Sequence, residues 1–269
     1  MVIGSKDFKT NGHTYIMGIL NVTPDSFYDG NSYTKIDSAI RRAVAMQDEG
    51  ADIIDIGGES TRPGYTMISS EEEIERVVPV IEAVKKETDL PVSLDTYKAD
   101  VAAAGINAGA DLINDIWGLK YDGKMADVIA KANIACCLMH NRKDTDYNDF
   151  VKDSINDLKE CVDIATAAGI DKNKIILDPG VGFAKDTDQN LEIIASLNEI
   201  NRLGYPVLLG VSRKSVVGNV LDIPKEERLI GTVALGVFGC LKNMMFLRVH
   251  DVKEHVQAVK MIEAVKRYM

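Results

Sequence analysis

The sequence IDIGGESTRPG, residues 54–64, joins an apolar strand to a polar, stiffened loop. Gly57-Gly58 ends the strand and lets the backbone approach a ligand closely or adopt a positive φ. Thr61 and Arg62 then offer two hydrogen-bond donors ahead of the turn predicted at Pro63-Gly64. Donors held at the carboxyl end of a strand suit the recognition of an anion. The alternative interpretation is that this stretch is an ordinary turn.

The same order, an apolar strand and then a helical pattern, recurs along the whole chain. Near-continuous apolar runs, typical of buried parallel strands, predict strands at residues 15–20, 52–56, 91–95, 111–114, 134–139, 174–178, 206–210 and 244–248. Apolar residues at helical spacing predict helices at 35–49, 71–87, 98–108, 123–132, 149–168, 187–203, 225–242 and 251–267. Eight strand-then-helix units in about 250 residues are typical of an α/β fold, the (β/α)8 TIM barrel.

Two further expectations complete the architecture. Residues 5–15 are mostly polar, and Asn11-Gly12 predicts the turn of a short N-terminal hairpin that closes one end of the barrel. An open doubly wound sheet is the alternative, but no G-x-G-x-x-G motif follows a strand, so a dinucleotide fold is unsupported. No linker or low-complexity segment interrupts the pattern, and we expect one domain over residues 1–269.

The composition narrows the class of protein. The chain has 269 residues, a net charge of −10 and a pI near 5.0, which argues against a nucleic-acid partner. The four cysteines lie in apolar or helical stretches without a C-x-x-C pair, so we expect them buried and reduced, as in the cytoplasm. We see neither a signal peptide nor an apolar run of about 18 residues, and we expect no membrane association.

Polar residues follow every predicted strand, and in a barrel such residues converge on one mouth. Asp95, Asn114 and Asp178 are hydrogen-bond acceptors that suit a flat heterocycle with amidine-like N–H donors. Met139 is placed to cover a face of such a ring. For each aspartate the alternative is a structural cap of the following helix.

A second group of residues is cationic. Arg62, Lys214, Arg248 and His250 gather near Asn21, because the first strand of a barrel closes against the eighth. Such donors beside a neutral amide oxygen suit a phosphate or diphosphate with its divalent cation. Two other histidines, His13 and His255, have no partner at ligand spacing, and we expect both on the surface. No H-E-x-x-H motif indicates a zinc site.

Six motifs in order resemble the dihydropteroate synthase family over essentially the whole chain. They are MGILNVTPDSF (17–27), GGESTRPG (57–64), Asn114-Asp115, LDPGVGF (177–183), Ser212-Arg-Lys214 and Arg248-Val-His-Asp251. The resemblance implies condensation of p-aminobenzoate with (7,8-dihydropterin-6-yl)methyl diphosphate to 7,8-dihydropteroate and pyrophosphate, by an SN1-like displacement assisted by Mg²⁺. It also implies competition by sulfonamides and a homodimer, for which an apolar helix offers Leu235, Val237, Phe238 and Leu241.

The resemblance also assigns roles to single residues. It places the pterin on Asp95, Asn114, Asp178, Lys214 and Met139, and the diphosphate on Asn21, Thr61, Arg248 and His250, with Mg²⁺ at Asn21. It places p-aminobenzoate against Thr61, Arg62, Pro63, Phe183, Lys214 and Ser215, where Ser215 opens a helix. It makes Asp29, Asp95 and Lys214 catalytic, with Asp29 and Thr61 on the mobile first and second βα loops. Tyr28 and Asn31 depart from the smaller residues often found in the first loop.

Two alternative functions share parts of this pattern. A pterin-dependent methyltransferase acting with a corrinoid protein would share the barrel and the pterin acceptors. It would not need Ser212-Arg-Lys214 together with the Thr61-Arg62 loop. A pterin-binding protein without catalysis is the second alternative, and intact residues at every matching position argue against it.

Overall fold

The computed structural model describes residues 1–9, 12–22, 32–59 and 67–269. Eight parallel strands form the main sheet in the spatial order β8-β7-β6-β5-β4-β3-β10-β9. A single parallel bridge between Leu177 and Val207 joins β8 to β9 and closes the sheet into a barrel. The strands are β3 (Tyr15–Asn21), β4 (Ile53–Gly57), β5 (Val92–Asp95), β6 (Leu112–Asp115), β7 (Ala135–Met139), β8 (Ile175–Asp178), β9 (Leu208–Leu209) and β10 (Phe246–Val249). The predicted (β/α)8 barrel is confirmed.

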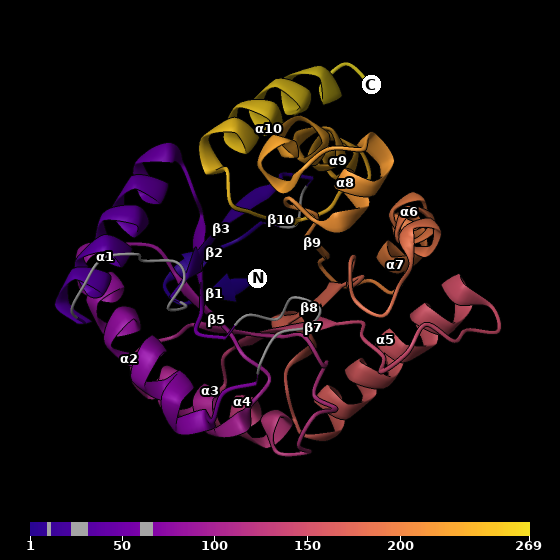
Figure 1. Ribbon diagram of the computed structural model, residues 1–269. Helices are drawn as coiled ribbons and strands as arrows, with labels where there is room; N and C mark the ends of the chain where they lie inside the picture. The colour runs from indigo at the N-terminus through magenta and orange to yellow at the C-terminus, as the bar shows by residue number, and fades with distance from the viewer. Residues whose placement is uncertain (10–11, 23–31, 60–66) are drawn as a thin grey trace.

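Helices surround this barrel on its outside (Figure 1). Their bounds are α1 (Ser32–Glu49), α2 (Ser70–Glu87), α3 (Ala99–Asn107), α4 (Met125–Ala132), α5 (Phe150–Ala167), α6 (Thr187–Ala195), α7 (Leu197–Asn201), α8 (Ser215–Leu221), α9 (Leu229–Leu241) and α10 (Val252–Lys266). The helix predicted at 187–203 is two helices, because Ser196 leaves the helical conformation. The helix predicted at 225–242 begins only at Leu229, after a 3₁₀ turn over Lys225–Glu227.

Alternation along each strand divides the apolar residues into two layers. One set, which includes Ile54, Ile56 and Leu94, packs against the helices in the larger core cluster. The other set faces the barrel interior and includes Ile53 and Phe246. Because side chains two apart on a strand point the same way, Asp55 and Gly57 lie above Ile53, and Arg248 lies above Phe246. The interior is therefore apolar where the strands begin and polar where they end.

The N-terminal hairpin exists but lies earlier in the chain than predicted. Its strands are β1 (Val2–Ile3) and β2 (Lys6–Asp7), and Gly4 turns between them with a φ of +58°. The following Phe8 inserts under the barrel, with its ring centroid 5.6 Å from that of Phe246. The prediction over 5–15 was wrong because it relied on Asn11-Gly12 and missed the turn at Gly4; Asn11 itself lies outside the described residues. Figure 1 shows the hairpin across the middle of the ring of strands.

Several smaller expectations can be compared with the structure. All four cysteines are buried and unbridged, as predicted. His13 is exposed, whereas His255 is buried, with its Nδ1 2.7 Å from the Asp251 carbonyl oxygen, so its assignment to the surface was wrong. In the described ranges, no helix is long and apolar enough to cross a membrane.

Candidate active site

One continuous row of residues lines the carboxyl ends of four neighbouring strands. Asn21 of β3 is in register with Gly57 of β4, Gly57 with Asp95 of β5, and Asp95 with Asn114 of β6. Residues in register on parallel strands point to the same side of the sheet, here the interior. A Cβ on Gly57 would lie 3.8 Å from Asp95 Oδ2 and 3.9 Å from Asn21 Oδ1, so the glycine leaves open space between them. The residues predicted for diphosphate and for pterin thus lie side by side.

Arg248 of β10 joins the two predicted halves of the site. Its Nε donates to Asp55 Oδ2 at 2.5 Å, and its Nη2 donates to Asp95 Oδ2 at 2.5 Å. The arginine side chain is only 19% exposed and Asp55 is fully buried. The sequence predicted Arg248 in a cationic half apart from the acceptors, and the structure instead places it between two carboxylates. Asp55 had no predicted role, although its alternation with Gly57 on β4 could have indicated an inward position.

Burial shapes the electrostatics of this group. Removal from water raises the pKa of Asp95 to about 7; the Arg248 guanidinium opposes this shift, and the nearby Asp55 carboxylate adds to it. Burial lowers the pKa of Arg248, but the carboxylates of Asp55 and Asp95 outweigh it and hold that pKa above its ordinary value. One oxygen each of Asp55 and Asp95 is buried without a hydrogen-bond partner in the described part of the chain. Such acceptors are available to a ligand with N–H donors.

Asp178 and Lys214 face each other on the other side of the mouth. Asp178 Oδ1 accepts from the Gly180 backbone N–H at 2.7 Å. A Cβ on Gly210 would lie 3.6 Å from Asp178 Oδ2 and 3.7 Å from Lys214 Nζ, so this glycine keeps the space between them free. Burial raises the pKa of Asp178, and burial lowers the pKa of Lys214 to about 8 even though Asp178 opposes that change. The pair can offer one acceptor and one donor to a ring that lies between them.

Apolar and aromatic side chains form a separate cluster beside these polar groups. Met139 packs with Tyr97 and Ile116 in a small cluster, and Trp117 and Phe183 lie against it. Lys214 Nζ lies 4.8 Å from the centroid of the Phe183 ring. Met139 and Phe183 were predicted, but Trp117 was not. It is the single tryptophan of the chain and lies two residues after the Asn114-Asp115 motif, which is the signal that could have revealed it.

His250 is a neutral donor rather than a cation. Burial lowers its pKa to about 3, and the charge of Arg248 lowers it further, so within the predicted cationic group His250 is a neutral imidazole donor. Its Nδ1 lies 2.9 Å from Ser212 Oγ, and that hydroxyl already accepts from the His250 backbone N–H at 3.1 Å. The hydroxyl proton is therefore free to point at Nδ1, which leaves the ring proton on Nε2.

Other polar residues at strand ends turn away from the mouth. Asp115 accepts from the backbone N–H groups of Trp117 and Leu119 at 2.8 and 2.7 Å, which makes it a structural cap. Arg213 forms a two-pronged ion pair with Asp251 at 2.9 and 2.6 Å. Convergence at the mouth thus depends on strand alternation as well as on polarity.

Six residues with a predicted part in the site belong to the first two βα loops. Asp29, Thr61, Arg62 and Pro63 lie outside the described residues, as do Tyr28 and Asn31. Ser215 is the first residue of α8, as predicted, directly after Lys214.

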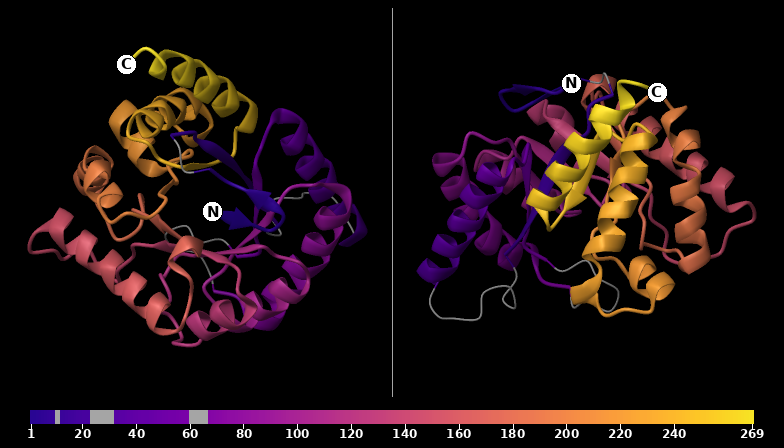
Figure 2. Two further views of the ribbon diagram at one scale, coloured as in Figure 1. Left: turned by 180° about the vertical axis from the view of Figure 1, so that it is seen from behind. Right: turned by 90° about the horizontal axis from the view of Figure 1, so that it is seen from above.

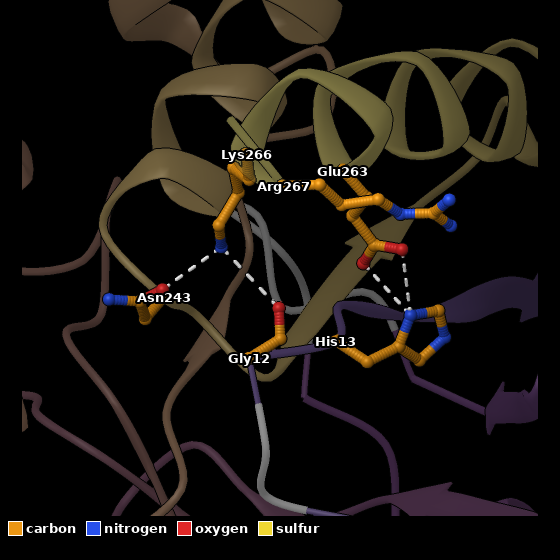
Figure 3. A pocket seen from close by; sticks show the side chains of 6 residues that line it. All are labelled: Gly12, His13, Asn243, Glu263, Lys266 and Arg267. Carbon is orange, nitrogen blue, oxygen red and sulfur yellow. Dashed lines mark hydrogen bonds and ion pairs between the residues drawn. The ribbon is translucent and has the colours of Figure 1, made fainter. Parts of the chain in front are cut away.

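A pocket of about 480 Å³ lies at the opposite end of the barrel, where the strands begin (Figure 3). His13 Nδ1 lies 2.8 Å from Glu263 Oε1, and Lys266 Nζ donates to Asn243 Oδ1 at 2.9 Å. Lys266 also donates to the Gly12 carbonyl oxygen at 3.4 Å. These contacts tie α10 to the N-terminal segment, and Figure 2 shows both termini at this end.

The fold and the site are those of a barrel whose mouth is suited to a flat, hydrogen-bonding ring beside an anion. A family model described as pterin binding enzyme matches residues 17–250. A dihydropteroate synthase from Clostridium beijerinckii is 57% identical, covering 99% of this chain and 100% of the relative. A dihydropteroate synthase structure from Clostridium difficile, determined in the presence of pteroic acid, has a TM-score of 0.93 and 50% identity, covering 95% of this chain and 97% of that one. A Yersinia pestis dihydropteroate synthase with a sulfonamide drug has a TM-score of 0.93 and 41% identity, with 99% of both chains covered.

The chain belongs to the dihydropteroate synthase family of pterin-binding enzymes.

Proposed function

We propose that the protein condenses p-aminobenzoate with (7,8-dihydropterin-6-yl)methyl diphosphate, which yields 7,8-dihydropteroate and pyrophosphate in folate biosynthesis. The observation that carries this proposal is the row of Asn21, Asp95 and Asn114 beside the doubly paired Arg248. Family membership supports it, as do relatives' structures that contain pteroic acid or a sulfonamide drug. Sulfonamides would compete with p-aminobenzoate.

The pterin lies in the mouth against the buried acceptors. Asp95, Asn114 and Asp178 accept from its ring N–H groups, since the free oxygen of Asp95 needs a donor when the site is filled. Lys214 donates from the far side of the ring, across the space left by Gly210. Met139 covers part of the ring face.

The diphosphate lies toward β3 and β10. Asn21, Thr61, Arg248 and the Nε2–H of His250 would bind it as donors or through a cation. Mg²⁺ would fit this place, because Asn21 Oδ1 faces the open space at Gly57 and Mg²⁺ typically combines few protein oxygens with substrate phosphates and water. Asn21 Oδ1 would be its protein ligand. When bound, Mg²⁺ supplies positive charge that stabilises the departing diphosphate.

p-Aminobenzoate enters beside the pterin methylene. Phe183 and Lys214, whose ring and ammonium lie 4.8 Å apart, would form one wall, with Ser215 at the start of α8. Thr61, Arg62 and Pro63 would complete the pocket from the loop after β4. The amine needs no strong base, because an aromatic amine is a neutral nucleophile at pH 7.

The residues of the mouth assist departure of the leaving group. An SN1-like displacement leaves positive charge on the pterin methylene, and the Asp95 carboxylate, one strand from Asn114, is placed to stabilise that charge. Arg248 holds Asp95 in place and offers its remaining N–H donors to the diphosphate. Lys214 balances charge on the opposite edge of the ring, and Asp29 would act from the first βα loop.

We also propose a homodimer in the cytoplasm. Of the predicted face, Leu235 and Phe238 pack partly buried against the core, whereas Leu241 is 40% exposed. Exposed apolar side chains also lie on α9 and α10. Ile230 of α9 is 82% exposed, and Met261 of α10 is 66% exposed. Sedimentation that finds only monomer at micromolar concentration would contradict the dimer.

The direct test measures pyrophosphate release from the pterin diphosphate with Mg²⁺, with and without p-aminobenzoate. We expect release to require p-aminobenzoate and to fall by about 100-fold or more in Lys214→Ala, because a charged donor is lost from a buried site. Lys131→Ala, an exposed lysine on α4, is the matched control and should match the wild type. Tight pterin binding without release would instead indicate a methyltransferase or a protein that binds pterin without catalysis.

A further inference from the structure

The loop after β8, residues 179–186, carries two contacts to Lys214. The Val181 carbonyl oxygen accepts from Lys214 Nζ, and the Phe183 ring lies beside the same ammonium. The position of Lys214 therefore depends on the conformation of this loop. That conformation is unfavourable by itself, because Ala184 has a φ of +45°, in a region that residues with a Cβ rarely adopt. Other parts of the molecule must hold it.

Lys185 holds the loop from within. Its Nζ donates to the carbonyl oxygens of Gly180 at 3.0 Å and Phe183 at 2.9 Å, and to His140 Nδ1 at 2.7 Å. Burial lowers the pKa of Lys185 to about 7, and in its ammonium form the three N–H donors match these three acceptors. The side chain thus ties the beginning and the end of the loop to each other and to the segment after β7.

His140 anchors Lys185 to the outer layer of helices. Its ring is fully buried and its Nε2 lies 3.0 Å from Asp157 Oδ2 on α5. Because Nδ1 accepts from Lys185, the ring proton lies on Nε2 and is donated to Asp157. Burial lowers the pKa of His140 to about 4, against the opposing effect of Asp157, which agrees with a neutral ring. Arg142 holds the same carboxylate through Nε at 2.6 Å.

We propose that Lys185, oriented by His140, is a positioning residue of the synthase reaction that keeps Phe183 and the Val181 carbonyl in place against Lys214. This inference rests on the proposed function. All three hydrogen bonds of Lys185 go to the loop and to His140, and none goes to the strand-end acceptors of the pterin site. Its loss should therefore weaken the use of p-aminobenzoate, which lies against Phe183, more than the binding of the pterin diphosphate, which keeps Asp95, Asn114 and Asp178 besides Lys214.

The test replaces Lys185 by methionine, which keeps the length of the side chain and removes its donors. We expect the KM for p-aminobenzoate to rise about 10-fold or more, since several hydrogen bonds are lost. The Kd of the pterin diphosphate, measured by calorimetry, should stay within about threefold. Hydrogen exchange of the backbone amides in residues 179–186 should become faster. Lys131→Met, the same change at an exposed lysine, should alter none of these quantities.

A double-mutant cycle separates positioning from general loss of stability. His140→Leu removes one acceptor of Lys185, so it should raise the same KM by a smaller factor. In the double variant with Lys185→Met, the KM should equal that of Lys185→Met alone, because His140 acts through Lys185. If the fold-increases in KM of the two single variants multiplied in the double variant, the two residues would act independently, and the proposed chain of contacts would be overturned.

Each outcome has a defined meaning. The proposal would be overturned if Lys185→Met had the same KM for p-aminobenzoate and the same hydrogen exchange as the wild type. It would also be overturned if the variant weakened the use of p-aminobenzoate and the binding of the pterin diphosphate by equal factors. If Lys185→Met does not fold, Lys185→Gln keeps part of the donor set and is measured in its place against the same criteria. A wild type without turnover would refute the proposed function, and hydrogen exchange of residues 179–186 would still decide whether Lys185 holds the loop.

Discussion

At the scale of single residues, Asp95 shows how a binding site lowers stability. In the folded protein the pKa of Asp95 is about 7, mainly because of burial, against an ordinary value of 3.8. Between these two pH values the folded state binds more protons than the unfolded state, so the free energy of unfolding decreases as pH rises. The penalty is complete above pH 7 and absent below about pH 4. The ion pair with Arg248 does not remove this penalty, because Arg248 also pairs with Asp55.

Asp95→Asn should therefore stabilise the protein and impair it as an enzyme. We expect the Tm of Asp95→Asn to exceed that of the wild type. The difference should grow from pH 4 to pH 7 and stay constant above pH 7. Each kcal/mol added to the free energy of unfolding should raise Tm by about 2–4 °C. We expect kcat/KM to fall about 10- to 100-fold, because a charged acceptor is lost. Calorimetry across pH and steady-state kinetics measure the two effects. Full kcat in Asp95→Asn would remove Asp95 from the mechanism.

At the scale of elements, the N-terminal hairpin acts as a plug for the end of the barrel opposite the site. Phe8 is 2% exposed, and its ring meets Tyr15 and Phe246 at centroid distances of 4.9 and 5.6 Å. The hairpin is too short to be stable alone, so its contacts with the barrel interior hold it in place.

Phe8→Ala should lower the free energy of unfolding by about 3–5 kcal/mol, because it opens a cavity beneath the interior cluster. Urea unfolding measures this change. Val2→Ala in the same hairpin is the control, since Val2 is 56% exposed, and it should change stability by less than about 0.5 kcal/mol. An equal loss in both variants would show that the hairpin, rather than the aromatic packing, is responsible. The KM values of folded Phe8→Ala should match the wild type.

At the scale of the whole molecule, the barrel has one weak seam. β3 and β4 pair over five residues, whereas β8 and β9 meet at the single bridge of Leu177 and Val207. Regions with few backbone hydrogen bonds open at a lower free energy than the global unfolding. The seam also divides the site, because Asp178 lies on β8 and Lys214 follows β9.

Hydrogen exchange should therefore be faster at residues 207–209 than at β3 and β4. The pterin diphosphate should slow exchange at the seam, because it contacts Asp178 and Lys214 on its two sides. Mass spectrometry of the free and ligand-bound protein measures both effects. Uniform exchange over all eight strands would contradict the weak seam, and protection confined to β5 and β6 would contradict a ligand that spans it.

Much of the fold and part of the site could be predicted from local pattern. Apolar runs located every barrel strand to within a few residues, because a buried parallel strand must be apolar on both faces. Polar residues at strand ends indicated Asn21, Asp95, Asn114 and Asp178, which do line the mouth. Polarity alone also suggested Asp115, and only strand alternation separates such caps from the residues that face inward.

The sequence by itself determined the order of strands and helices, the family motifs and which residue types meet at the mouth, because these depend on short-range periodicity and chain order. Tertiary structure alone decided that Arg248 lies between Asp55 and Asp95, 193 and 153 residues away. It also decided the neutral state of His250, the burial of His255 and the three acceptors of Lys185. The physical reason is that pairing and desolvation depend on which distant groups surround a side chain, and only the closed barrel brings those groups together.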